Sequence, residues 1–208
     1  MTVNSDLQTL REKLASESII ALDIRTGREF SRAHIPGSVS APYSSWGWGS
    51  SVREWLAGTA SEVALISSNP VILKKASEEL SKNGITVSYS ISDDLKEWVS
   101  LGFQVSKLHE IDPETLNNEK DSWEIIDVRE PYELNYGMIE GAMNVPMSEV
   151  QGLPGRLDRS KKYAIVCAHG NRSEAAAIFL GDNGLHAATL VGGMAAWMRS
   201  SLPVVYPE

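Results

Sequence analysis

The chain contains a single cysteine, Cys167, and it lies in a short loop whose neighbours suit a nucleophile. The segment from Cys167 to Ser173 reads Cys-Ala-His-Gly-Asn-Arg-Ser and stands between an apolar run and an alanine-rich stretch. A loop that wraps over a helix N-terminus points successive backbone N–H groups at one place, where the helix dipole adds positive potential. An ordinary cysteine thiol is only a few per cent ionised at pH 7 and needs such help to form a thiolate. The loop therefore predicts an activated thiolate at Cys167.

The elements that must position this loop are a strand before it and a helix after it. The apolar residues 163–166 predict a buried strand. Residues 173–182 predict a helix that ends at Asn183-Gly184, because glycine can take the left-handed conformation that closes a helix.

The same unit occurs twice along the chain. Residues 22–42 align without gaps on residues 126–146 at one offset, 127 − 23 = 104, and residues 63–84 align on residues 163–184 at an offset of 100. The first block contains six matched pairs: Asp23 and Asp127, Arg25 and Arg129, Glu29 and Glu133, Ile35 and Ile139, Gly37 and Gly141, and Pro42 and Pro146. We therefore expect two domains, residues 1–105 and 106–208.

Each copy alternates short apolar runs with helix-like segments, which predicts an α/β domain with a parallel sheet flanked by helices. Residues 19–24, 63–66 and 124–128 are further expected strands, and residues 74–82 are a further expected helix. Asp112-Pro113 is typical of a helix start, with Asp112 as the N-cap. The extra residues of the first copy, around 46–49, are rich in tryptophan and glycine and are expected to form a loop.

Together, four features resemble a rhodanese domain, and the resemblance covers both halves of the chain. They are Asp127-x-Arg129 after a strand, Ile139-x-Gly141-Ala142, the Cys167 loop, and Gly192-Gly193 before Trp197. The family pattern usually has Gly-His-Ile where this chain has Gly137-Met138-Ile139, which puts one structural hydrogen bond in doubt; the first copy keeps the histidine as His34.

The resemblance implies a sulfurtransferase in which the loop cysteine holds sulfur as a persulfide. Cys167 would attack the outer sulfur of a small anionic donor such as thiosulfate, and a thiol or cyanide would then take the sulfur. Arg172 would attract the donor, because a guanidinium can bind two oxygens at once. His169 either adds positive charge or faces solvent, and Ser173 either begins the helix or donates to the persulfide. The expected substrate-binding residues are Ala168, His169, Gly170, Asn171, Arg172 and Ser173.

Two other functions stay open. Phosphatases that share the rhodanese fold have five residues between Cys and Arg, whereas this loop has four, so a phosphatase or arsenate reductase is disfavoured. The chain also lacks the Cys-Gly-Ser-Gly-Val-Thr type of loop of the mercaptopyruvate branch, which favours thiosulfate-like donors. The second alternative is a relay module whose persulfide passes to a protein partner.

The first copy is expected to be silent. Opposite Cys167, His169, Gly170 and Arg172 it has Ser67, Asn69, Pro70 and Ile72. A serine hydroxyl does not ionise at neutral pH, proline lacks a backbone N–H, and isoleucine cannot bind an anion. The first copy is expected to recruit a partner, to cover the second copy, or to shape its entrance with Trp46 or Trp48. Asp127 and Arg129, which recur as Asp23 and Arg25, are interpreted as structural, and Trp98 and Trp197 as core residues.

Bulk properties exclude several classes of protein. The net charge of −8, with no run of Lys or Arg, argues against binding nucleic acid. No apolar run approaches the roughly 20 residues of a membrane span, and the N-terminal residues lack the pattern of a secretory signal, so a cytoplasmic location is expected. One cysteine and four scattered histidines predict no disulfide and no metal site. No cofactor is expected.

Overall fold

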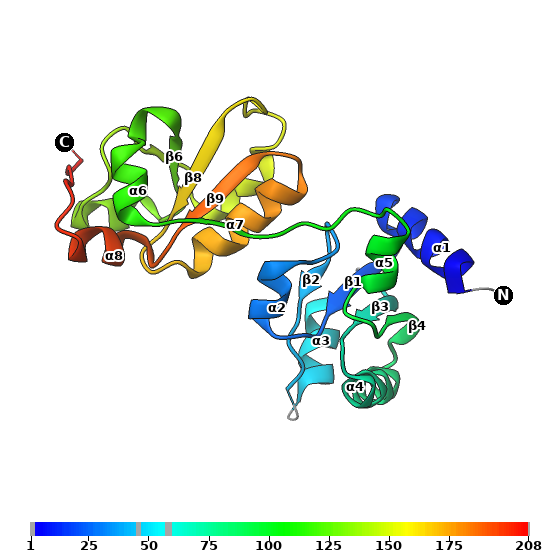
Figure 1. The fold of residues 1–208 in the computed structure, drawn as a ribbon. Helices are drawn as coiled ribbons and strands as arrows, with labels where there is room; N and C mark the ends of the chain where they lie inside the picture. The colour runs from blue at the N-terminus through cyan, green and yellow to red at the C-terminus, as the bar shows by residue number, and fades with distance from the viewer. Residues whose placement is uncertain (1–2, 45–46, 57–59, 208) are drawn as a thin grey trace. The chain divides into compact units, whose positions relative to one another are not determined.

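The computed structural model describes residues 3–44, 47–56 and 60–207. The chain divides into two compact units, Met1–Ser106 and Lys107–Glu208, called here the first and second domains (Figure 1). Each is built on a parallel sheet flanked by helices. The predicted fold class is confirmed.

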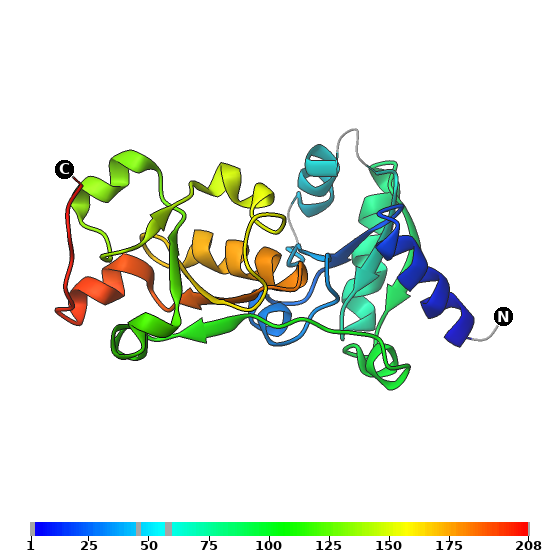
Figure 2. The ribbon, with the colours of Figure 1, turned by 90° about the horizontal axis from the view of Figure 1, so that it is seen from above.

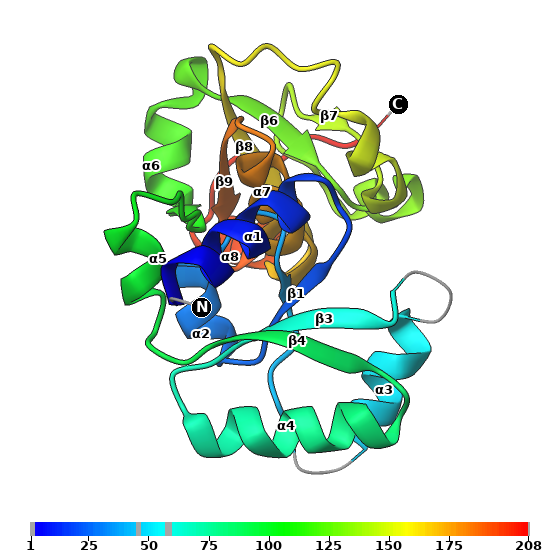
Figure 3. The same ribbon diagram turned by 90° about the vertical axis from the view of Figure 1, so that its right-hand side faces the viewer.

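The first domain has a sheet of strand order β2-β1-β3-β4. Its strands are β1 (Ile20–Asp23), β2 (Val39–Ser40), β3 (Glu62–Ile66) and β4 (Thr86–Ile91), and its helices are α1 (Val3–Ala15), α2 (Gly27–Arg32), α3 (Trp48–Leu56), α4 (Pro70–Lys82) and α5 (Lys96–Ser100). Helices α3 and α4 pack on one face of the sheet, and α1 and α5 pack on the other (Figure 3).

The second domain has a sheet of order β5-β9-β8-β6-β7. Its strands are β5 (His109–Ile111), β6 (Glu124–Asp127), β7 (Met143–Asn144), β8 (Lys162–Val166) and β9 (His186–Leu190). Its helices are α6 (Pro113–Asn118), α7 (Asn171–Asp182) and α8 (Gly193–Arg199), with 3-10 turns η1 (Lys120–Ser122), η2 (Pro131–Tyr136) and η3 (Met147–Gly152). Helix α7 and turn η3 cover one face, and α6 and α8 cover the other (Figure 2).

The central strands are buried on both faces, which explains their unbroken apolar sequences. In β8, Ala164 packs on the α6 and α8 side, while Ile165 packs on the α7 side, and both are fully buried. The predicted helix ends are confirmed, because Gly84 and Gly184 follow α4 and α7 at φ of 78° and 80°. So is the start of α6, where the Asp112 side chain accepts a hydrogen bond from the N–H of Thr115.

One expectation about the first domain is wrong. Residues 46–49 were expected in a loop, but Trp48 and Gly49 open helix α3. Trp48, Val52 and Leu56 follow one another at four-residue spacing, so they lie on one helix face and are buried there. Trp46, expected at the entrance of the site, lies outside the described residues.

The repeated aspartate and arginine of each domain form a buried ion pair just after a strand. In the second domain, Arg129 Nε and Nη2 donate to both carboxylate oxygens of Asp127, and Nη2 also donates to the Gly137 carbonyl. Arg25 and Asp23 repeat the arrangement, with the Ala33 carbonyl as acceptor. Each pair thereby fastens the end of a strand to the loop that follows.

The repeated tryptophans belong to the core. Trp98 is 3% exposed and Trp197 is 1% exposed. Each indole N–H donates to a backbone carbonyl, that of Gln104 and that of Pro203 respectively. Burial of the ring with its polar atom satisfied is the arrangement expected of a packing residue.

Candidate functional site

Cys167 lies directly after β8, at the carboxyl edge of the second sheet, and is buried, with 2% of its surface exposed. Helix α7 begins four residues later, at Asn171. The loop is therefore held between a central strand and a helix of 12 residues. This is the strand, loop and helix arrangement that the sequence predicts.

Hydrogen-bond donors surround the Cys167 sulfur. The backbone N–H of Gly170 donates to Sγ at 3.1 Å, and Ser173 Oγ lies 3.4 Å from Sγ. Burial raises the pKa of the thiol, but hydrogen bonds from the Ser173 side chain and from the backbone N–H groups of Ser173, Gly170 and His169 lower it. The net result is a pKa below the ordinary value of 9.0. The surroundings thus favour the thiolate despite its burial.

The first turn of α7 is open towards this sulfur. Its N-cap is Gly170, at φ of 112°, a backbone conformation that favours glycine. Most helix N-caps supply a side-chain oxygen to the first N–H groups, and glycine has none. At this end of α7 the N–H groups of Gly170 and Ser173 face Sγ, and an anionic sulfur would accept from both.

The equivalent helix of the first domain is closed. The Asn69 side chain caps α4, its Oδ1 accepting from the N–H groups of Val71 at 3.0 Å and Ile72 at 3.3 Å. Pro70 occupies the first position of the helix and has no N–H to offer. Ser67 Oγ itself accepts from the N–H of Asn69 at 3.2 Å. The backbone N–H groups of this loop therefore already donate to side-chain oxygens of Ser67 and Asn69 and are not available to an anion.

Arg172 forms a two-pronged ion pair with Glu133 of η2. Arg172 Nη1 and Nη2 lie 2.6 and 2.7 Å from the two carboxylate oxygens. Chiefly through this contact, Arg172 holds the pKa of Glu133 at about 2, and Glu133 raises the pKa of Arg172. Glu133 also accepts from the N–H of Glu130, which fixes the start of η2. Arg172, expected to contact a donor anion, is here anchored to the loop after β6.

Sequence reasoning missed Glu133 as part of the site. Glutamate occurs in both copies, as Glu29 and Glu133, and was counted only as a repeat match. Glu29 accepts hydrogen bonds from the N–H and the hydroxyl of Thr26 and so caps α2, just as Glu133 caps η2. Only the second copy has an arginine, Arg172, where the first has Ile72. That difference was the signal that Glu133 has a second partner.

Two other contributions were missed, and both come from beyond α7. Thr189 of β9 places Oγ1 2.8 Å from Ser173 Oγ. At the start of α8, the N–H groups of Met194 and Ala195 donate to the carbonyls of Cys167 and Ala168 at 2.8 and 3.0 Å. The loop is therefore supported from two further elements, β9 and α8.

The remaining predicted loop residues differ in exposure. Ala168 is half-buried, Gly170 and Ser173 are buried, and His169 and Asn171 are exposed. The backbone of His169 faces the sulfur while its side chain reaches solvent. In the first domain the His34 ring Nδ1 lies 2.9 Å from the Phe30 carbonyl oxygen, a side-chain hydrogen bond that Met138 cannot repeat. The backbone pairing is kept, since Met138 and Val205 exchange two hydrogen bonds, as His34 and Ser106 do.

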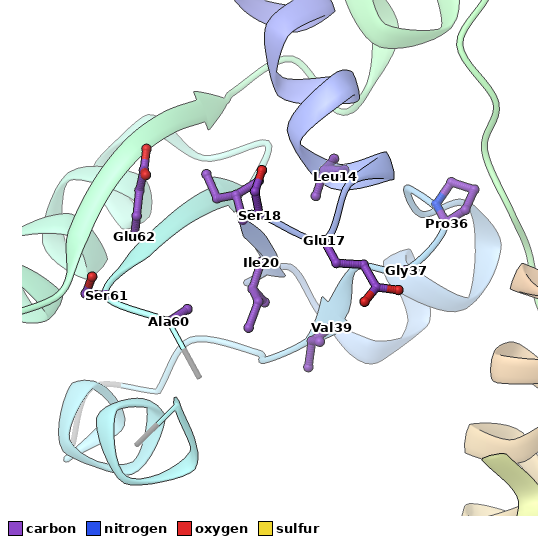
Figure 4. A pocket seen from close by; sticks show the side chains of 11 residues that line it. Leu14, Glu17, Ser18, Ile20, Pro36, Gly37, Val39, Ala60, Ser61 and Glu62 are labelled. Carbon is purple, nitrogen blue, oxygen red and sulfur yellow. The ribbon is translucent and has the colours of Figure 1, made fainter. Parts of the chain in front are cut away.

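Cavities of the first domain lie at both ends of its sheet. One of about 280 Å³ adjoins the Ser67 loop and is lined by residues that include Arg25, Glu29, Tyr43 and Ile72. Another, of about 640 Å³, lies where β1, β2 and β3 begin, between Leu14, Pro36 and Glu62 (Figure 4). The second is at the edge opposite to the loop, because parallel strands all end on the same side.

Within residues 3–44, 47–56 and 60–207, no three His, Cys, Asp or Glu side chains gather in a way that would hold a metal ion. In that same part of the chain, no helix has both the length and the apolar character needed to cross a membrane.

Comparison with known proteins agrees with the fold. A sulfurtransferase of Allochromatium vinosum is 33% identical over 105 residues, covering 49% of this chain and 98% of that protein. Thiosulfate sulfurtransferase GlpE of Shewanella oneidensis is 34% identical over 84 residues, covering 40% of this chain and 83% of that protein. The solved structure of a thiosulfate sulfurtransferase from Pseudomonas aeruginosa has a TM-score of 0.50 at 16% identity, covering 97% of this chain and 43% of that one, a likeness of fold.

The family described as Rhodanese-like domain matches residues 6–101 and again residues 112–200. The two matches fall one in each domain and together take in most of the chain. The chain therefore belongs to the rhodanese-like domain family and contains two such domains.

Proposed function

We propose that the protein is a sulfurtransferase in which Cys167 carries a sulfur atom as a persulfide. The observation that carries the proposal is the position of the Cys167 sulfur, buried at the open N-terminus of α7 among backbone N–H groups and the Ser173 hydroxyl. These donors stabilise a thiolate and would equally stabilise the terminal charge of a persulfide. The relatives named as sulfurtransferases support the same chemistry.

With thiosulfate as the donor, the first step is a displacement at sulfur. The Cys167 thiolate attacks the outer sulfur, a bond forms between Sγ and that atom, and the sulfur–sulfur bond of thiosulfate breaks. Sulfite leaves with the bonding electron pair, and the cysteine becomes an anionic persulfide. The total charge of −3 is the same before and after the step.

The second step restores the cysteine. Cyanide, or the thiolate of a small molecule, attacks the outer sulfur of the persulfide and leaves with it as thiocyanate or as a new persulfide. The electron pair of the broken sulfur–sulfur bond returns to Sγ. No metal or cofactor takes part in either step.

Arg172 is the proposed contact for the anionic donor. Two of its five N–H groups are used in the pair with Glu133. Its side chain is 37% exposed, so further N–H groups can meet a sulfonate at the loop. His169, exposed on the same loop, is proposed as a second point of contact.

Intact mass spectrometry after incubation with thiosulfate tests the proposal. The wild-type protein should gain one sulfur atom and lose it when cyanide is added. Cys167→Ser is the matched control and should gain none. A wild-type protein that acquires no sulfur would overturn the proposal.

The Arg172–Glu133 pair favours a second candidate, a persulfide relay that serves a protein acceptor. The carboxylate neutralises the charge expected to draw in small anions. Beside it on η2, Tyr132 and Tyr136 are 68% and 74% exposed, and exposed aromatic rings suit protein contacts. Steady-state rates distinguish the two candidates. A slow reaction with thiosulfate and cyanide that accelerates only when a protein thiol acceptor is present indicates the relay.

The first domain is proposed to lack this chemistry, and Ser67 with its capped helix supports that assignment. The protein is proposed to act in the cytoplasm, where reducing conditions keep a thiol free.

A further inference from the structure

A chain of two buried hydroxyl groups lies behind the Cys167 sulfur. Ser173, on α7, is 0% exposed, and Thr189, on β9, is 1% exposed. Thr189 Oγ1 lies 2.8 Å from Ser173 Oγ, which in turn lies 3.4 Å from Cys167 Sγ. Thr189 does not touch the sulfur in this arrangement, so it can act on it only through Ser173.

The number of hydroxyl and thiol hydrogens limits which hydrogen bonds Ser173, Thr189 and Cys167 can make at the same time. A serine hydroxyl has one hydrogen and accepts through two lone pairs, and Ser173 Oγ has three partners: Cys167 Sγ, Thr189 Oγ1 and, at 2.8 Å, the carbonyl oxygen of Gly170. When Cys167 is a thiol, its S–H donates to Ser173, Ser173 donates to the Gly170 carbonyl, and Thr189 donates to Ser173. Every polar group is then satisfied.

Loss of the thiol proton changes what Ser173 must do. The thiolate can only accept, so the Ser173 hydrogen has to turn from the Gly170 carbonyl to Sγ. The Gly170 carbonyl is not left unpaired, because the N–H of Glu174 donates to it at 2.8 Å. The buried Ser173 oxygen, however, needs a donor of its own to remain satisfied in this orientation. Thr189 Oγ1 is placed to supply it.

We propose that Thr189 is a positioning residue, whose hydroxyl donates to Ser173 Oγ and so leaves the Ser173 hydrogen free to bind Cys167 Sγ when the sulfur is anionic. The first domain offers a comparison, because Leu73 stands at the position of Ser173, 173 − 73 = 100 residues earlier in the aligned block. A leucine cannot extend a hydroxyl chain. The first domain thus lacks both the cysteine, replaced by Ser67, and the serine hydroxyl, replaced by Leu73.

The charged groups around Cys167 belong to neighbouring elements. Arg172 lies in the first turn of α7 and pairs with Glu133 of η2, and its pKa is raised in part by the charge of Cys167. Glu174 lies one residue beyond Ser173, the Asp127–Arg129 pair lies after β6, and His169 lies in the loop itself. A Thr189→Val substitution leaves all of these in place, so a change in the titration of Cys167 would report the lost hydroxyl.

Alkylation of Cys167 by iodoacetamide, followed from about pH 5 to about pH 10, tests the proposal, because the thiolate is the reactive form. In Thr189→Val we expect the midpoint of the pH–rate profile to move to higher pH, and the alkylation rate at pH values below the wild-type midpoint to fall about three- to tenfold, the effect of one buried hydrogen bond. Thr189→Ser, which keeps the hydroxyl, should retain the wild-type profile. Thr115→Val, on the exposed start of α6, is the matched control and should also leave the profile unchanged.

A wild-type midpoint in Thr189→Val would overturn the proposal, and so would a shift in Thr189→Ser as large as that in Thr189→Val. The inference rests on the proposed role of Cys167 as a sulfur carrier, yet its readout does not require sulfur transfer. If the wild-type protein fails to take sulfur from thiosulfate, the proposed function fails while the alkylation profiles still test Thr189. If sulfur loads normally and Thr189→Val titrates as wild type, only the role of Thr189 fails.

Discussion

Gly193 packs against the carbonyl of Cys167 so closely that a Cβ at Gly193 would lie 2.3 Å from that oxygen. It would also lie 2.9 Å from the backbone nitrogen of His169. The approach lets the next residue, Met194, donate its N–H to the Cys167 carbonyl. The backbone that carries the sulfur is thus pinned by the start of α8, while the sulfur is held by the start of α7.

Gly193→Ala is therefore expected to displace the Cys167 loop. Gly193 has φ of +58°, which adds backbone strain to the clash. We expect a loss of about 1–3 kcal/mol in the free energy of unfolding of the second domain and at least a tenfold slower gain of sulfur from thiosulfate. Gly181→Ala in α7 is the matched control, because a Cβ there meets nothing within 4 Å. A Gly193→Ala protein that loads sulfur at the wild-type rate would contradict this account.

Removal of the Glu133 carboxylate should weaken the second domain in a pH-dependent way. The folded-state pKa of Glu133, about 2, lies below its ordinary value of 4.5, so the ion pair stabilises the fold fully above pH 4.5 and loses this effect as pH falls towards 2. Arg172 is 37% exposed and solvent screens the pair, so Glu133→Gln should cost about 1 kcal/mol at pH 7. Hydrogen exchange measured separately for each domain should show that the stability of the second domain in Glu133→Gln approaches that of wild type as the pH falls towards 2. Glu29→Gln is the control and should leave the second domain unchanged.

The Asp127–Arg129 pair should matter far more to stability. Both side chains are at most 3% exposed, and Asp127→Asn would leave the guanidinium buried without its anion, which costs about 3–5 kcal/mol. Asp23→Asn should cost the first domain less, because Arg25 Nη1 keeps a second anion, Asp94, at 2.6 Å. Protease susceptibility mapped along the chain checks both variants. If wild type and Asp127→Asn are equally resistant to protease in the second domain, the Asp127–Arg129 pair contributes little to the stability of that domain.

A cysteine placed in the first domain should remain unloaded. In a Ser67→Cys, Cys167→Ser double variant, the N–H groups of Val71 and Ile72 still bind the Asn69 side chain, and Pro70 still lacks an N–H. We expect no sulfur on this protein after incubation with thiosulfate, measured by intact mass. A mass gain would mean that the closed helix end does not prevent the chemistry.

Much of the fold follows from local sequence. Strands β1, β3, β6 and β8 show in runs of apolar residues, and the ends of α4 and α7 show in Asn-Gly pairs, because burial and left-handed glycines act over a few residues. The strand, loop and helix around Cys167 are local in the same way. These are the parts that the sequence predicts.

The missed features depend on pairs that are distant along the chain. Glu133 meets Arg172 across 39 residues, and Ser173 meets Thr189 across 16. Such contacts are set by the order of strands in the sheet, which no single segment encodes. The close approach of Gly193 to Cys167 has the same origin. Helix α3 is different. The four-residue spacing of Trp48, Val52 and Leu56 can be read from the sequence, but Gly49 in the first turn favours a loop.

The glycine at the start of α7 has a thermodynamic consequence for the second domain. Because folding lowers the pKa of Cys167 below 9.0, the folded chain holds the thiolate more readily than the unfolded chain does. The domain should therefore become harder to melt as pH rises through the folded-state pKa, reaching the full gain above 9.0, and Cys167→Ser should abolish the gain. The first domain, whose helix is closed by Asn69, should melt independently of this chemistry. The melting temperature of the second domain would then report the ionisation state of the Cys167 sulfur.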